Sequence, residues 1–171
     1  HRDACLYMED MVRENAPLSE YLIKTLHSLV LMDRPDDKGR YRSLSVMITG
    51  SPAELPDAWE VPIKMERLME RYDGELTQLH TIEKVALFHL LFESIHPFID
   101  GNGRTGRLIM NLDLMKDGYL PIDVKFTDRA KYVEAFKVWH LEKTADPMID
   151  LIYQYQEQEL EKRITLLQNE Y

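Results

Sequence analysis

His96-Pro97-Phe98-Ile99-Asp100-Gly101-Asn102-Gly103-Arg104-Thr105-Gly106-Arg107 is the stretch of sequence that decides the fold. Before it, residues 81–95 are apolar on almost every face of a helix, which predicts a central, buried helix. The ring of Pro97 disfavours helical backbone at His96, so this helix is expected to end there. A second helix is expected over residues 103–116. The sequence therefore predicts two packed helices joined by a short polar loop.

A loop of this kind is suited to binding an anion. The free N–H groups of residues 101–105 point out of the second helix, whose dipole adds roughly half a positive charge at that end. Arg104 and Arg107 are three residues apart, lie on one face of the helix and suit a di- or triphosphate. Asp100 is a hard oxygen ligand, of the kind that holds Mg²⁺ beside phosphates. His96 is able to accept a proton from an attacking hydroxyl group near neutral pH.

Each of these residues also has an ordinary structural explanation. A histidine at a helix end, an aspartate before Gly-Asn and two arginines on a helix surface all occur in proteins where they bind nothing. A plain turn does not need all of these polar groups so close together, which favours a binding site. Gly101-x-Gly103-x-x-Gly106 also matches the dinucleotide-binding fingerprint, but that fingerprint requires a preceding strand where a helix is expected here. We therefore reject a Rossmann-type site.

The remaining sequence predicts an all-α bundle with one small β-hairpin. Helical spacing is found over residues 4–15, after a capping Ser19, over residues 61–72, after Thr127-Asp128 and after Asp146-Pro147. In residues 41–49 the pattern changes to the alternation of a strand. The apolar members of that alternation are Leu44, Val46 and Ile48, and the intervening ones are Ser43, Ser45 and Met47.

Composition and charge limit the class of protein. The 171 residues form one domain, 1–171, and no apolar run is long enough to cross a bilayer, so no membrane partner is expected. A net charge of −9 argues against binding to nucleic acid. Cys5 is the only cysteine, so we expect a reducing, cytoplasmic setting. Because the first residue is His1, we also expect a fragment of a longer protein.

The twelve-residue stretch resembles the signature of the Fic family, His-Pro-Phe-x-(Asp/Glu)-Gly-Asn-(Gly/Lys)-Arg-x-x-Arg, at every fixed position. The similarity extends over about residues 18–152 and includes Gly39-x-Tyr41-Arg42, His89 and Gly118-Tyr119. This resemblance implies a helical core. It also implies transfer of AMP from ATP to a Tyr, Thr or Ser hydroxyl group of a target protein, with release of pyrophosphate.

The resemblance also implies a role for each residue of the motif. His96 would be the catalytic base that activates the hydroxyl group. Asp100 would hold Mg²⁺, with Mn²⁺ as the other candidate metal. Asn102 would stabilise the charge that grows on the α-phosphate. The residues implied to bind the phosphates are Gly101 and Gly103 through their amides, Asn102, Arg104 for the β-phosphate and Arg107 for the γ-phosphate.

Two further regions of the family site have counterparts here. Family members carry a hairpin flap that pairs with an extended segment of the target, and residues 43–48 fit it, although a hairpin that only covers the core is the alternative. The adenine pocket is expected on the helix after the motif, where Tyr132 and His140 are the candidates. The residues of the expected flap are Ser43, Leu44, Ser45, Val46, Met47 and Ile48.

Other readings of the same site stay open at this stage. The similar Doc-type kinases have Lys where Gly103 stands, so Gly103 favours nucleotidyl transfer. Use of another nucleotide or phospho-donor, removal of AMP and a non-catalytic nucleotide sensor are the alternatives. The family's inhibitory pattern, (Ser/Thr)-x-x-x-Glu-(Gly/Asn), fits no segment, since residues 165–170 have the Glu one position late. Inhibition is then missing, supplied by a separate antitoxin or located upstream of His1, and we favour a helix upstream of His1. Auto-modification and assembly into a homo-oligomer through the stripe Leu160, Ile164 and Leu167 also stay open.

Overall fold

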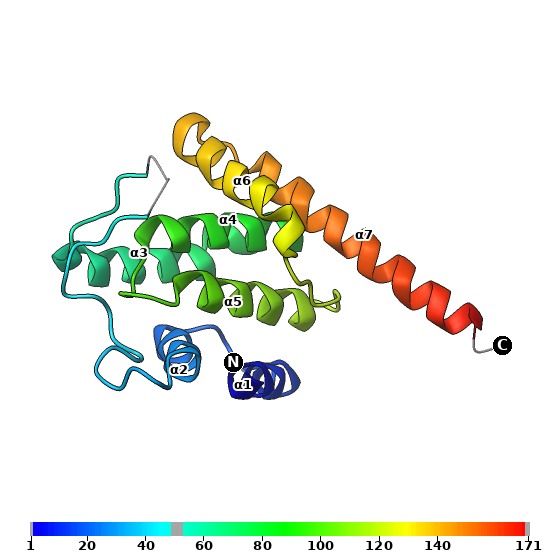
Figure 1. The fold of residues 1–171 in the computed structure, drawn as a ribbon, viewed down its shortest axis with the longest axis horizontal. Coiled ribbons are helices and arrows are strands. Elements are labelled where there is room, and N and C mark those ends of the chain that lie inside the picture. Colours follow the sequence, from blue (N-terminus) through cyan, green and yellow to red (C-terminus); the bar gives the residue numbers. More distant parts are fainter. Residues whose placement is uncertain (1, 49–52, 170–171) are drawn as a thin grey trace.

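The computed structural model describes residues 2–48 and 53–169, and in this part of the chain it consists of seven α-helices, three short 3-10 turns and connecting loops. α4 and α5 run side by side through the middle, with α1 and α2 on one side of this pair and α6 and α7 on the other side (Figure 1). The all-α prediction is confirmed. The helices are α1 (Arg2–Arg13), α2 (Glu20–Val30), α3 (Val61–Asp73), α4 (Thr81–Ile95), α5 (Asn102–Lys116), α6 (Arg129–Glu142) and α7 (Asp146–Asn169).

α4 is apolar on nearly all faces because it separates two hydrophobic cores. Phe88 and Phe92 pack into a core shared with α1, α2, α3 and α5. Val85 and Leu90 point the other way, into a core shared with α5, α6 and α7. Burying each such side chain contributes roughly 1.5–3 kcal/mol, so both cores hold α4 in place. No helix in the described ranges is long and apolar enough to cross a lipid bilayer.

The helix ends follow local sequence signals in part. Ser19 caps α2 as predicted, because its Oγ accepts a hydrogen bond from the Leu22 N–H at 3.2 Å. α4 ends at Ile95, as the following His96-Pro97 predicts. Asp128 is the N-cap residue of α6 as predicted, but its side chain makes no capping bond and instead accepts a hydrogen bond from the Tyr155 hydroxyl group at 2.7 Å.

The strand predicted over residues 41–49 is wrong for the described part, since residues 41–48 contain no strand. The Arg42 N–H donates to the carbonyl oxygen of Pro97 at 2.9 Å, and its guanidinium group donates to those of Leu44 and Pro56 at 3.0 and 2.6 Å. These contacts fasten the segment to the motif loop, whereas a strand needs a neighbouring strand to satisfy its backbone. Thr49 and the expected turn lie outside the described residues.

Candidate functional site

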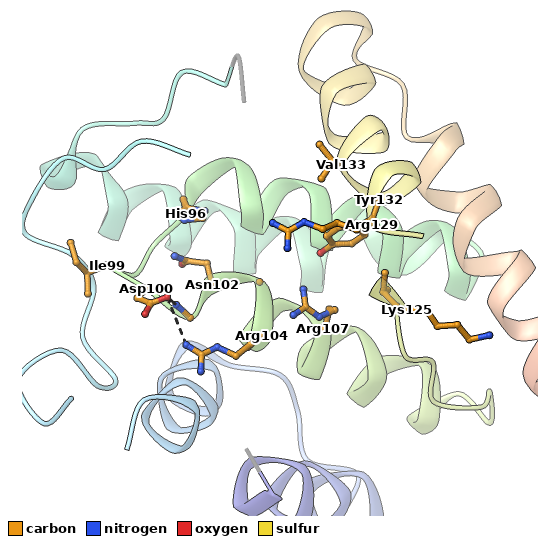
Figure 2. A pocket seen from close by; sticks show the side chains of 13 residues that line it. His96, Ile99, Asp100, Asn102, Arg104, Arg107, Lys125, Arg129, Tyr132 and Val133 are labelled. Atoms are coloured by element: carbon orange, nitrogen blue, oxygen red, sulfur yellow. Dashed lines mark hydrogen bonds and ion pairs between the residues drawn. The ribbon is translucent and has the colours of Figure 1, made fainter. Parts of the chain in front are cut away.

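His96 leaves α4 in a left-handed backbone conformation, with φ 48° and ψ 62°. This region costs a residue with a side chain about 1–2 kcal/mol, so surrounding contacts must hold it. The buried Arg42 supplies them, because its Nε donates to the His96 carbonyl oxygen at 2.8 Å and its N–H binds the next carbonyl group. The His96 side chain therefore leaves the end of α4 in a fixed direction, toward the loop and the start of α5 (Figure 2).

A second contact fixes the middle of the loop. The Phe98 ring is fully buried and stacks on His27 of α2, with 3.6 Å between ring centroids. His27 Nδ1 accepts a hydrogen bond from the Gly39 N–H at 2.9 Å, so its Nε2 must donate to the Asp100 carbonyl oxygen, also at 2.9 Å. Burial lowers the pKa of His27, which favours this neutral form. His27 thus joins α2 and the 34–39 turn to the loop.

Asn102 closes the loop from the other end. Its Oδ1 accepts a hydrogen bond from the Phe98 N–H and its Nδ2 donates to the Phe98 carbonyl oxygen, both at 2.8 Å. The residue is only 2% exposed. The loop thus uses the Oδ1 atom and one N–H of Nδ2, while the second N–H of Nδ2 and the backbone N–H of Asn102, at the start of α5, are the donors left to meet a ligand.

The loop and the first turns of α5 form one wall of a cavity of about 550 Å³, a size that accommodates a small-molecule ligand. Figure 2 shows His96 and Asn102 on one side of it, Asp100 and Arg104 below, and Arg107, Arg129 and Tyr132 on the other side. The cavity brings together nearly all the predicted motif residues. The residues that line it are His96, Ile99, Asp100, Gly101, Asn102, Gly103, Arg104, Arg107, Val124, Lys125, Arg129, Tyr132 and Val133.

Two predicted groups of site residues are not in this lining. His140 lies two turns beyond Tyr132 on α6, and it is not among the residues that line the cavity. The expected flap, residues 43–48, also contributes none of the lining, although Leu44 and Met47 are exposed by 66% and 94%. Of the candidate adenine residues Tyr132 and His140, the structure thus places Tyr132 in the same cavity as the motif loop.

The charges of the cavity are only loosely paired with one another. Asp100 Oδ1 accepts the Gly101 N–H at 2.6 Å and lies 3.7 Å from a guanidinium nitrogen of Arg104. Asp100 Oδ2 lies 3.4 Å from Arg34. All three charged side chains are about half exposed, so these ion pairs contribute little and a ligand replaces them easily.

The Fic/DOC family matches residues 17–114, which is more than half of the chain. The chain belongs to the Fic/DOC family. It is 41% identical over 105 residues to "Protein adenylyltransferase Fic" of Nematostella vectensis, covering 58% of this chain and 23% of that protein. It is 37% identical over 97 residues to a "Probable protein adenylyltransferase" of Aquifex aeolicus, covering 57% and 29%. The chain thus spans about a quarter of the length of these curated relatives.

The fold of this Fic/DOC domain is also that of a solved relative. The structure of Fic-1 from C. elegans superimposes with a TM-score of 0.86 at 26% sequence identity, covering 99% of this chain and 51% of that chain. The superposition extends well beyond the 98 residues of the family match, over α6 and α7 as well. Helices on both sides of the motif therefore belong to one conserved arrangement.

Three site residues of this Fic/DOC domain are missed by sequence reasoning. Arg129, the first residue of α6, adds a third arginine to the cavity, and its only sequence signal is its place after the expected cap. Arg34 pairs with Asp100 from a turn 66 positions away in the sequence. Arg42 is in a segment where a strand is expected. These residues reach the motif through the fold, so spacing along the chain does not reveal them.

A metal ion in this cavity would need oxygen ligands beyond those that the protein side chains supply. No group of three or more His, Cys, Asp or Glu side chains that could hold a metal occurs in the described part of the chain. Asp100 is the one carboxylate among the described residues lining the cavity, and half its side chain is exposed. Mg²⁺ commonly takes one or two carboxylates together with substrate phosphates and water, so the donor set fits an ion that arrives with the nucleotide.

Proposed function

We propose that this Fic/DOC domain transfers AMP from ATP to a hydroxyl side chain of a target protein and releases pyrophosphate. The observation that carries the proposal is the gathering of a histidine, a carboxylate, three arginines and a helix N-terminus around one cavity. The adenylyltransferase names of its relatives support the same reaction. We extend the activity to this chain as a proposal, since the chain spans only part of those proteins.

In the proposed reaction the hydroxyl oxygen of the target attacks the α-phosphorus of ATP. A new P–O bond forms, the bond from the α-phosphorus to the oxygen that bridges to the β-phosphate breaks, and pyrophosphate leaves with that oxygen. Nε2 of His96 takes the proton of the hydroxyl group. A general base of this kind typically contributes about 10²–10⁴-fold to the rate.

The phosphates would lie along the start of α5. The backbone N–H groups of Asn102 and Gly103 would bind the α-phosphate, where the helix dipole favours negative charge, and the N–H of Gly101 would join them on releasing the Asp100 carboxylate. Arg104 and Arg107 would bind the β- and γ-phosphates, and Asp100 would hold Mg²⁺ or Mn²⁺, which neutralises phosphate charge when bound. The side chain of Asn102 would hold the loop closed, and its second Nδ2 N–H would stabilise the charge that grows on the α-phosphate. This arrangement would position the phosphates and neutralise charge as it develops.

The adenine is proposed to bind in the cavity at the end away from His96, and the target is proposed to bind outside the cavity lining, along residues 43–48. Tyr132 lies on α6, away from His96, and its ring is the candidate surface for the adenine (Figure 2). Residues 43–48 leave Leu44 and Met47 exposed next to the segment that Arg42 fastens to the loop. We propose that an extended segment of the target binds there, main chain to main chain.

Incubation with Mg²⁺ and ATP labelled at the α- or the γ-phosphate tests the proposal. We expect the α-label, and not the γ-label, on a target protein or on the domain itself, with mass spectrometry locating an added AMP. His96→Ala should bind ATP as the unmodified protein does and lose the transfer. Transfer of the γ-label would instead indicate kinase chemistry, and ATP binding without any label would indicate a nucleotide sensor.

A further inference from the structure

Glu93, in the last turn of α4, has a buried carboxylate to which the proposed reaction assigns no role. Its Oε2 lies 3.5 Å from Nδ1 of His96, and the two side chains are 10% and 20% exposed. His96 Nδ1 and Glu93 Oε1 both lack a hydrogen-bond partner among the described atoms. Burying a carboxylate without a strong partner is costly, so a buried Glu at this position calls for a functional explanation.

Gly106 of α5 makes the space in which this carboxylate lies. A Cβ atom at Gly106 would be 2.9 Å from Glu93 Oε1 and 2.9 Å from Cε1 of His89. His89 cannot neutralise the carboxylate, because burial lowers its pKa to about 4 and its Nε2 is hydrogen-bonded to Tyr132 at 2.6 Å. Among the described residues, the ion pair seen for Glu93 is the one that its Oε2 makes with Nδ1 of His96.

We infer that Glu93 is a positioning residue that holds His96 with its proton on Nδ1. An N–H at Nδ1 facing a carboxylate leaves Nε2 unprotonated, and Nε2 is then the atom able to take a proton in the cavity. The inference rests on the proposed function, since it says which ring nitrogen of the proposed catalytic base, His96, carries the proton. A separation of 3.5 Å is longer than a strong hydrogen bond, and such contacts are often loose before a substrate binds.

Two other roles for Glu93 predict different behaviour. It could only fill space against Gly106, in which case any side chain of similar size would serve. It could also hold Arg107, because both side chains approach Gly103. A Cβ atom built on Gly103 would lie 3.2 Å from Nη1 of Arg107 and 4.0 Å from Oε1 of Glu93. In that case its loss would weaken ATP binding and raise KM, whereas a role on His96 lowers kcat.

The experiment compares Glu93→Met, which keeps the bulk and removes the acceptor, with Glu93→Gln, which keeps an acceptor oxygen. Glu83→Met, an exposed position on the same helix, is the matched control. We expect Glu93→Met to lower kcat by about 10–100-fold with little change in KM for ATP, and Glu93→Gln to retain more of the rate. Unchanged melting temperatures would exclude a folding defect. A wild-type kcat in Glu93→Met, or a change in KM alone, would overturn the inference.

A second measurement does not depend on activity. Nitrogen-15 NMR of the histidine rings distinguishes a proton on Nδ1 from one on Nε2, and the signals missing in His96→Ala identify His96. We expect Nδ1–H in the unmodified protein and a shift toward Nε2–H in Glu93→Met. Nε2–H in the unmodified protein would overturn the inference even if transfer occurs. If no AMP is transferred, the proposed function is wrong. The NMR measurement of the His96 tautomer still tests the role of Glu93 in that case.

Discussion

Asn102→Ala should strongly lower the free energy of unfolding of this domain, although the sequence suggests that Asn102 binds a ligand. The substitution removes both hydrogen bonds to Phe98, each 2.8 Å long, and leaves a backbone N–H and a carbonyl group unpaired in a buried loop. Each buried group left without a partner costs about 1–3 kcal/mol, so the loss is about 2–6 kcal/mol. That is a large part of the 5–15 kcal/mol that is typical of a whole domain.

Urea unfolding followed by circular dichroism, without nucleotide, measures this loss. Asn111→Ala is the matched control, because Asn111 also lies on α5 and makes the same pair of bonds, both 2.9 Å, to the backbone of Ile122. Asn111 is only partly buried, so water replaces its bonds and the cost should be smaller. If Asn102→Ala is no less stable than Asn111→Ala, the side chain does not close the loop as we argue.

Three further substitutions test other parts of the structure by the same unfolding measurement. Phe98→Ala should cost about 3–5 kcal/mol, because it empties a fully buried ring site against His27, and a loss below that of a surface substitution would contradict the packing. Ser19→Ala should cost about 1 kcal/mol by removing the cap of α2. Burial lowers the pKa of His89 from 6.5 to about 4, so between these pH values the unfolded chain binds a proton that the folded protein does not. The stability should therefore fall by about 3 kcal/mol as the pH drops through that window, and His89→Gln should remove this dependence.

The helices and the position of the loop could be predicted because their signals are local. α4 has apolar residues all round and is followed by a proline, and α2 has a serine at its start, so both were readable from the sequence. The alternation in residues 41–48 was equally regular, but a strand depends on a partner strand elsewhere. Here the segment instead binds the loop through Arg42, a contact that spans 54 positions.

The site could be predicted for the residues within the motif and not for those around it. A contiguous motif at a helix start places His96, Asp100 and two arginines near one another whatever the rest of the fold does. Arg129 enters the cavity because α6 packs against α4, where Tyr132 bonds to His89 and Trp139 bonds to Ser94, and the spacing of residues in the sequence does not reveal that packing. The hold of Asn102 on its own loop was not predicted, because a side chain that binds its own loop and one that binds a phosphate look the same in a sequence.

The contacts that shape the loop differ in kind from those that would meet a ligand. Arg42, His27 and Asn102 hold the loop through buried hydrogen bonds to its backbone, which water does not weaken. Asp100 and Arg104, by contrast, are about half exposed and paired at 3.7 Å. Added salt should therefore weaken ATP binding by screening the exposed charges while leaving the unfolding free energy nearly unchanged. Salt that lowered both in parallel would mean that the exposed ion pairs, and not the buried hydrogen bonds, hold the loop.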